Sequence, residues 1–271
     1  MTVSLTKTIP YWHVDAFATK AFRGNQAAIM VLEKWLPDQV LQAIAAENMF
    51  AETAFLVRNS SHEADWELRW FTPEVEVALC GHATLASGHV LLSQAQSSEN
   101  RITFSTRKAG LLEVMRTAEG YGLKLPTTQV TRTENDELIQ ALGVRGEVFE
   151  SSSGIEGNAI VLLESESALR AVKPDFIKLA GIDLMVICTA PGDKTDIVSR
   201  VFVSAWGVDE DSVTGSAHAV LAPFWADRLG RKTFTAHQAS TRGGDLSLRA
   251  EGGYAWLFGN CITVVSGQFY L

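Results

Sequence analysis

The sequence predicts an α+β fold built from two similar halves. Residues 69–92 and 200–225 share one plan: an extended run, a tight turn and then an alanine-rich apolar helix. A second pair of segments, 24–33 and 157–164, begins with Gly-Asn and continues with aliphatic residues. The two pairs lie at nearly the same offset along the chain, which favours an internal duplication over coincidence. We therefore expect two related halves with one cleft between them.

The turn at Cys80, Gly81 and His82 is the candidate centre of the first half. Before it, Val75 and the residues up to Leu79 alternate with a period of two, which predicts a strand. After it, the chain is apolar nearly all round, which predicts a helix buried in a core. A buried helix start has N–H groups that need partners and favour an anion. We therefore expect an anion-binding turn here.

Periodicity and turn residues predict the remaining elements. Strands are expected at residues 11–17, 27–32, 54–57 and 184–188, and helices at 37–47 and 174–180. A polar, proline-led stretch, 126–134, is the expected linker and divides the chain into residues 1–125 and 126–271. Pro223 lies inside the second apolar helix and is expected to end or kink it.

Composition excludes several classes of protein. A formal net charge of −8 argues against a nucleic-acid partner, because phosphate binding needs a basic surface. The longest apolar runs are far shorter than the roughly 20 residues that a membrane span requires. The first residues lack the basic start and apolar core of a secretory signal, so we expect a cytoplasmic protein. The three cysteines and six histidines are scattered, and we expect no metal.

Glu52 is the sharpest candidate for acid–base chemistry. It is a lone carboxylate among apolar neighbours, at the entry to a predicted strand. Burial disfavours the charged form of a carboxyl group, so the group gains and loses its proton nearer to neutral pH. This property suits a catalyst that both takes and gives a proton. The alternative is a surface or capping glutamate, which is the commoner situation for this residue type.

Further candidates flank the two helix starts. Asp211 precedes the second helix, where acidic residues ordinarily act as caps. His82 is either a donor or proton relay at the turn or a satisfied core histidine. Ser216 occupies the matching place in the second half and is either a site hydroxyl or a cap. We interpret His89 and His218, inside the helices, as packing residues.

Cys80 and Thr214 also occupy matching places. Two thiols facing each other would make a two-base racemase, but an ordinary hydroxyl does not ionise near neutral pH as a perturbed thiol can. The Thr214 hydroxyl therefore argues against a cysteine-pair racemase. Cys80 is then interpreted as a small buried apolar residue.

Several motifs occur together in one known family. They are Phe22-Arg-Gly-Asn25, Asn48-Met-Phe-Ala-Glu52, Cys80-Gly-His-Ala-Thr84, Glu210-Asp-Ser-Val-Thr-Gly-Ser-Ala217, and Gln238 with Arg242-Gly-Gly244. Over nearly its whole length the chain resembles the phenazine-biosynthesis PhzF-like family. Gln26, Ala51 and the Ser212-Val213 pair depart from the residues that the family often has, and these departures bear on the substrate.

The resemblance implies the diaminopimelate epimerase-like fold, with two pseudo-symmetric halves that each wrap a mixed, barrel-like sheet around a central helix. In that fold the last strand can cross back to the first half. The resemblance also implies an isomerase that moves a hydrogen on a small carboxylate-bearing, cyclic substrate, acts without a cofactor and forms a homodimer. The family's catalytic residues fall on Glu52, His82, Asp211 and Ser216.

We expect Asn25, Gly81, Thr214 and Gly215 to bind the substrate, with backbone N–H groups around the two glycines holding its carboxylate. Two alternatives stay open. One is an amino-acid racemase or epimerase on the same fold, and the other is a non-catalytic protein that binds a small ligand.

Overall fold

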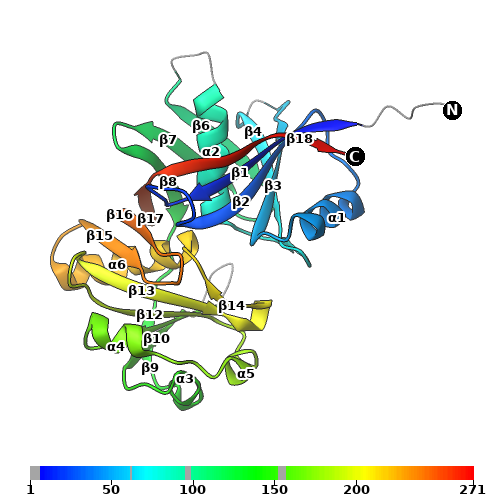
Figure 1. Cartoon of the computed structure of the whole chain (residues 1–271). Helices are drawn as coiled ribbons and strands as arrows, with labels where there is room; N and C mark the ends of the chain where they lie inside the picture. Colours follow the sequence, from blue (N-terminus) through cyan, green and yellow to red (C-terminus); the bar gives the residue numbers. More distant parts are fainter. Residues whose placement is uncertain (1–6, 62, 95–98, 152–156) are drawn as a thin grey trace. The chain divides into compact units, whose positions relative to one another are not determined.

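The structure is a computed structural model that describes residues 7–61, 63–94, 99–151 and 157–271 (Figure 1). The chain forms two compact units. Unit 1 comprises the residues up to Phe22, Gln26–Leu123 and Asn260–Leu271, and unit 2 comprises Arg23–Asn25 and Lys124–Gly259. The chain passes from unit 1 to unit 2 between Leu123 and Lys124, close to the expected boundary after residue 125. Residues 23–25 group with unit 2, and the last strand groups with unit 1, as the resemblance implied that it can.

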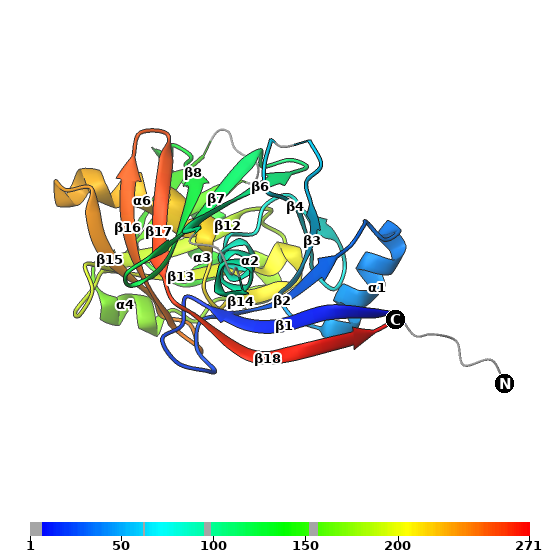
Figure 2. The same ribbon diagram turned by 90° about the horizontal axis from the view of Figure 1, so that it is seen from above.

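Unit 1 encloses one helix within strands. Its elements are β1 (Thr8–Ala16), β2 (Asn25–Leu32), α1 (Asp38–Asn48), β3 (Glu52–Arg58), β4 (Trp66–Phe71), β5 (Glu76–Val77), α2 (Gly81–Gln94), β6 (Arg101–Thr106), β7 (Leu111–Thr117) and β18 (Cys261–Tyr270). Helix α2 contacts β1, β3, β6, β7 and β18. Figure 2 shows α2 nearly end-on, with strands of this unit around it. Helix α1 packs on the outer face of β2 and β3 through Leu41 and Ile44.

The sequence of α2 explains its central position. Its apolar side chains are buried on several sides, so no polar face needs water. The buried hydroxyls of Thr84 and Ser87 donate to carbonyls of the helix itself, at Cys80 and Ala83. A Cβ atom at Gly88 would lie 2.3 Å from Val114 Cγ1, so the helix approaches β7 closely only because this residue is glycine.

Unit 2 is built in the same way. Its elements are β9 (Thr131–Thr133), α3 (Asp136–Leu142), β10 (Glu147–Glu150), β11 (Asn158–Leu162), α4 (Glu166–Ala171), α5 (Phe176–Leu179), β12 (Met185–Pro191), β13 (Ile197–Val203), a 3₁₀ turn (Ser204–Trp206), β14 (Val208–Asp211), α6 (Gly215–Leu229), β15 (Thr233–Gln238), β16 (Gly244–Glu251) and β17 (Tyr254–Gly259). Helix α6 packs against β16 and β17. Helices α3, α4 and α5 pack against β10–β13 on the outer face. Strand β8 (Gly120–Pro126) carries the chain from unit 1 into unit 2.

The two units pair their strands in the same order. In unit 1, β2 and β3 are parallel, β3 and β4 antiparallel, and β4 and β6 parallel. In unit 2, β11 and β12 are parallel, β12 and β13 antiparallel, and β13 and β15 parallel. The last strand, β18, pairs with β1 as β9 pairs with β10. The predicted α+β fold with two similar halves is confirmed.

One ion pair between neighbouring strands is also repeated. The guanidinium of Arg69 donates two hydrogen bonds to Glu76, at 2.7 and 2.8 Å. Arg200 does the same with Glu210, at 2.8 and 2.9 Å. Each pair joins the strand before the turn to the short strand that leads into the central helix, and such two-pronged contacts fix the geometry of both.

Three expectations about local structure are corrected. The strand expected over 75–79 is shorter and comprises only Glu76–Val77, which pair with β4. Val75 is 57% exposed and lies outside this strand pairing. The expected linker contains β9, which pairs with β10. Pro223 does not end α6, which continues to Leu229.

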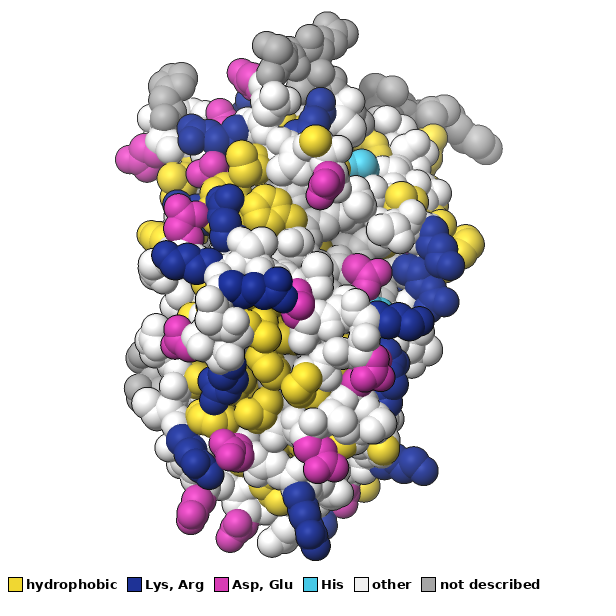
Figure 3. Space-filling view, turned by 90° about the vertical axis from the view of Figure 1, so that its left-hand side faces the viewer, with side chains coloured by type: hydrophobic (Ala, Val, Ile, Leu, Met, Phe, Trp, Pro, Cys, Tyr) yellow, Lys and Arg dark blue, Asp and Glu magenta, His cyan; other side chains and the backbone are white. Residues whose placement is uncertain are grey.

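The surface carries charges of both signs. On the face in Figure 3, lysine and arginine side chains are interspersed with aspartate and glutamate. In the described part of the chain, no helix is long and apolar enough to cross a membrane.

Candidate active site

Glu52 and His82 lie together in unit 1. Glu52 opens β3 with its side chain 18% exposed, and His82 is the second residue of α2 with its side chain 5% exposed. His82 Nε2 lies 3.1 Å from Glu52 Oε2 and 3.2 Å from the carbonyl oxygen of Gln26. A carbonyl only accepts, so Nε2 donates to Gln26. Glu52 Oε2 is buried, and apart from this contact with His82 Nε2 it has no hydrogen-bond partner among the described residues.

The carboxylate holds a proton on His82. Burial alone lowers the pKa of His82, but the Cys80 sulphur and the Glu52 carboxylate outweigh it and raise the pKa well above its ordinary value of 6.5. Burial, reinforced by the charge of Glu52, raises the pKa of the Cys80 thiol to about 12. The sulphur is therefore neutral near pH 7, and Glu52 is the group that favours the imidazolium.

Cys80 is a buried residue at the start of α2. Its sulphur lies 3.6 Å from His82 Nδ1, and the N–H of Ala83 points to it. The side chain thus satisfies one of the N–H groups that the helix start leaves without a carbonyl acceptor. A thiol in this state is a poor proton acceptor, which agrees with the interpretation of Cys80 as a small buried residue.

Two residues next to this pair were not predicted as site residues. The backbone carbonyl of Gln26 accepts from His82 Nε2, and the side-chain Nε2 of Gln26 lies 3.1 Å from His13 Nε2. The ring of His13 stacks on Phe50, with ring centroids 4.2 Å apart. Gln26 directly follows the Gly-Asn pair that marks the repeat. In the sequence, only this position and the departure from the family motif distinguish it.

The remaining predicted site residues lie in unit 2, around the turn before α6. Asp211 Oδ1 accepts from Asn25 Nδ2 and from the N–H of Ser212, both at 2.8 Å. Its Oδ2 accepts from the Thr214 hydroxyl at 2.6 Å. Asn25 Nδ2 also donates to the Val213 carbonyl at 2.9 Å. Asp211 therefore organises the turn, whereas the residue at the N-cap of α6 is Thr214.

Gln238 completes this network. It is fully buried at the end of β15, where its Oε1 accepts from the N–H of Thr214 and its Nε2 donates to the Asp211 carbonyl, both at 2.8 Å. In the sequence, Gln238 stands out only as part of a family motif. A buried amide that uses both ends in this way fixes the turn in one conformation.

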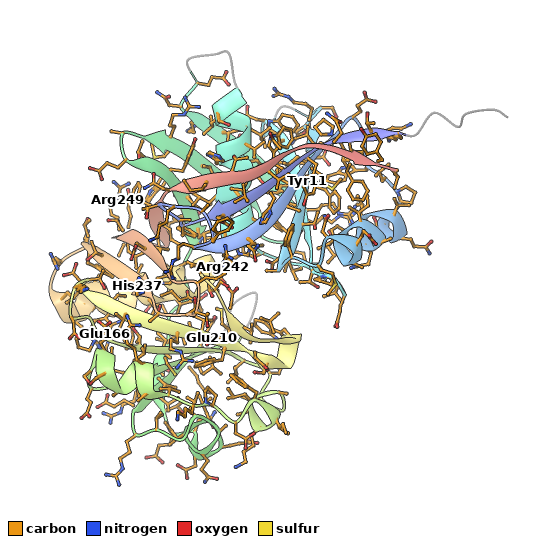
Figure 4. All side chains as sticks on the ribbon, in the orientation of Figure 1. Tyr11, Glu166, Glu210, His237, Arg242 and Arg249 are labelled. Atoms are coloured by element: carbon orange, nitrogen blue, oxygen red, sulfur yellow. The ribbon has the colours of Figure 1, made fainter. Side chains whose placement is uncertain are left out.

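Residues 23–25 are bound to unit 2 by backbone contacts. Arg242, labelled in Figure 4, donates from Nε to the Gly24 carbonyl at 2.8 Å. The N–H of Gly24 donates to the Gly243 carbonyl at 2.8 Å. Asn25 and Gln26 are adjacent in the chain. The side chain of Asn25 donates to Asp211, and the carbonyl of Gln26 accepts from His82.

Ser216 and His218 lie in the first turns of α6. The hydroxyl of Ser216 donates to Met185 Sδ at 3.7 Å, so it does not cap the helix. His218 is fully buried between the Thr214 carbonyl and Ser199, and burial lowers its pKa to about 4. It is a neutral packing residue, as predicted. His89 contacts Thr263 and Tyr121.

The structure thus gathers the predicted residues into two groups. Glu52, Gly81 and His82 meet in unit 1, and Asn25, Asp211, Thr214, Gly215 and Ser216 lie around one turn in unit 2. Their roles in catalysis and substrate binding stay predictions.

Glu52, Cys80 and His82 also meet the distance requirement of a cation site, since one ligand atom of each lies within 4.8 Å of the others. In this structure His82 Nε2 donates to the Gln26 carbonyl, so that nitrogen is already occupied.

Comparisons with known proteins identify the family. The sequence model of the phenazine biosynthesis-like protein family, PhzC-PhzF, matches residues 14–267. A Pseudomonas aeruginosa protein named as an uncharacterized isomerase is 46% identical over 266 residues, which cover 97% of this chain and 99% of the relative.

Solved structures agree. A PhzF-family protein from Enterococcus faecalis is 40% identical, with a TM-score of 0.90 over 98% of this chain and 100% of that one. A hydroxyproline epimerase from Agrobacterium vitis shares the fold, with a TM-score of 0.62 at 13% identity over 97% of this chain and 93% of that one. The chain therefore belongs to the phenazine biosynthesis-like protein family, and it is an isomerase with the fold of an amino-acid epimerase.

Proposed function

We propose that the protein moves a hydrogen on a small carboxylate-bearing substrate by acid–base catalysis without a cofactor, with Glu52 as the group that takes and returns the proton. The observation that carries this proposal is the close pair of Glu52 and His82, in which Glu52 Oε2 lies 3.1 Å from His82 Nε2. The Glu52 side chain is 18% exposed and that of His82 only 5%, so the carboxylate is the member of the pair that a substrate can reach.

The step that we propose is balanced without a further reactant. Glu52 accepts a proton from a carbon of the substrate, and the electron pair of the broken bond moves into the adjacent unsaturated system. The protonated Glu52 then returns the proton to another carbon, so substrate and product are isomers. The His82 imidazolium and the N–H groups around Gly81 stabilise negative charge as it builds on the substrate.

In unit 2, we assign substrate binding to the turn that contains Thr214, Gly215 and Ser216. The family motif supports this assignment, as does the rigid hydrogen-bond network around Asp211. Asn25 and Asp211 hold the turn, and Ser216 has only a weak sulphur acceptor to give up when a substrate binds. Homodimer formation and a cytoplasmic location remain expectations from the resemblance and the sequence.

A two-thiol racemase fits the structure less well. The Cys80 thiol is neutral because of its burial, and the Thr214 hydroxyl already donates to Asp211 at 2.6 Å. Neither group is a ready base. Epimerisation would instead require a proton to reach the same carbon on its opposite face, which a single base fixed on one side of the substrate does not deliver.

The experiment begins with a thermal-shift screen of small cyclic and amino-acid carboxylates. Each stabilising compound is then incubated with the protein in heavy water, and NMR follows both the exchange of carbon-bound hydrogen and the appearance of an isomer. Glu52→Gln is expected to lower both rates by at least about 100-fold. The matched control is Glu47→Gln, which makes the same change at an exposed position of α1.

Three outcomes separate the possibilities. Loss of exchange in Glu52→Gln but not in Glu47→Gln supports the proposal. Exchange that survives in Glu52→Gln would show that another group moves the proton. Ligand binding without exchange in the wild-type protein would identify a binding protein that does not turn over the compound.

A further inference from the structure

A cavity of about 270 Å³ opens in unit 1 where the sheet divides. Strand β4 pairs with β6 through Trp66–Leu68 and with β5 through Trp70 and Phe71. Arg69 lies between these two pairings. At Arg69 the sheet therefore divides, with β5 on one side of the opening and the turn after β6 on the other. The lining residues that matter here are Arg69, Trp70, Glu76, Ala78, Arg107 and Lys108.

The corresponding gap in unit 2 is closed by polar side chains. There β13 pairs with β15 and β14 in the same way. The amide of Gln238 spans the gap to the Asp211 carbonyl at 2.8 Å, and the Ser240 hydroxyl donates to the Ser212 carbonyl at 2.7 Å. The repeated framework therefore does not require a cavity.

Unit 1 lacks the groups that would close its gap. The strand registers match Thr106 to Gln238, because Leu68 pairs with Thr106 as Ser199 pairs with Gln238. The Thr106 hydroxyl donates instead within its own turn, to the Gly110 carbonyl at 2.8 Å. Two residues further on, Lys108 stands in the place of Ser240 and is exposed. The cavity thus follows from side-chain replacements on a shared backbone.

The lining has an excess of positive charge. Glu76 accepts from Arg69 and, at 3.0 Å, from Arg107. Asp38, from α1, contacts the same two arginines. Even with both carboxylates counted, Lys108 remains without an ion pair among the described residues. An anion entering the cavity would therefore meet a cation whose charge is not already neutralised.

We infer that this cavity is a second ligand site, separate from the group around Glu52, and that it binds a small anion through a carboxylate or phosphate group. Its volume lies just below the range of about 300–1,000 Å³ that is usual for small-molecule pockets, so the guest is small. The anion contacts Lys108 and Arg107.

The test measures binding of two probes, inorganic phosphate and succinate, by titration calorimetry at constant ionic strength. We expect saturable binding of at least one probe, and the probe that binds identifies the anion class. Lys108→Glu is expected to weaken this binding by about tenfold or more, because it replaces the attracting charge with a repelling one. Lys173→Glu makes the same change at an exposed position of unit 2 and is expected to have no effect.

A second variant separates the cavity from general electrostatics. Ala78→Leu keeps every charge and fills the space, so it is also expected to abolish binding. Glu52→Gln is expected to leave it intact. The inference is overturned if neither probe binds, if Lys173→Glu weakens binding as much as Lys108→Glu, or if Ala78→Leu binds normally. Loss of binding in Glu52→Gln would also overturn it, because the probe would then occupy the proposed active site.

Discussion

In α6, the ring of His218 is completely buried and joins two parts of unit 2. Its Nδ1–H donates to the Thr214 carbonyl at 2.8 Å, so its Nε2 is the acceptor for the Ser199 hydroxyl at 3.3 Å. Burial lowers the pKa of His218 to about 4, from an ordinary value of 6.5. Acid is therefore expected to destabilise the protein at this residue.

The sign and size follow from proton binding. Below pH 6.5 the unfolded chain binds a proton at this histidine that the folded protein does not, so the free energy of unfolding falls as the pH falls. The contribution is complete above pH 6.5 and is lost as the pH approaches 4. At 1.36 kcal/mol per pKa unit, the full loss is about 3 kcal/mol.

Urea unfolding of the wild-type protein and of His218→Gln tests this expectation. Glutamine can donate and accept at similar positions but does not titrate, so the difference between the two curves isolates the histidine. Between pH 7.5 and 4.5, the wild-type protein is expected to lose about 2–3 kcal/mol more stability than the variant. If the two proteins lose stability in parallel, the ring of His218 is not held neutral by burial.

Three more substitutions test the packing and the site. Gly88→Ala is expected to lower the free energy of unfolding by about 1–2 kcal/mol, since the clash with Val114 outweighs the better helix propensity of alanine, whereas Gly267→Ala, in open space, is expected to be harmless in the same denaturation assay. Cys80→Ala is expected to retain hydrogen exchange in heavy water, because a neutral buried thiol does not serve as the base; complete loss of exchange in a folded variant would restore a role for the thiol. Gln238→Leu is expected to cost about 3 kcal/mol in urea unfolding, since it leaves buried groups unpaired, and a cost near zero would mean that water replaces the amide.

Local sequence determined much of the architecture. The apolar residues of α2 and α6 have no polar face, and this pattern predicts a central helix wherever it occurs. The aliphatic run of β2 and the helical spacing of α1 are equally local, and both elements lie where they were expected. Because the chain carries this plan twice, the duplication was visible before any strand pairing was known. The motif around Glu52 is also local, and it identifies that carboxylate as a candidate site residue.

Other features depend on contacts between residues that are distant in the sequence. Periodicity does not reveal that β18 pairs with β1, or that residues 23–25 belong to unit 2, since a strand pattern carries no label for its partner. Pro223 was expected to end or kink α6, and the helix does not end there but continues to Leu229. Residues just after the proline are held by packing, since Phe224 contacts Phe149 and Trp225 donates to Thr189.

The chemistry of the candidate site was decided in the same way. From sequence, His82 was as plausible as a core histidine as it was as a site residue, and Gln26 was only a departure from a family motif. The pKa of His82 and the inertness of Cys80 result from burial and from the neighbouring Glu52 carboxylate, which lies on strand β3. The sequence shows which titratable side chains a protein has and how they are spaced. The charge that each of them carries depends on the neighbours that folding places around it.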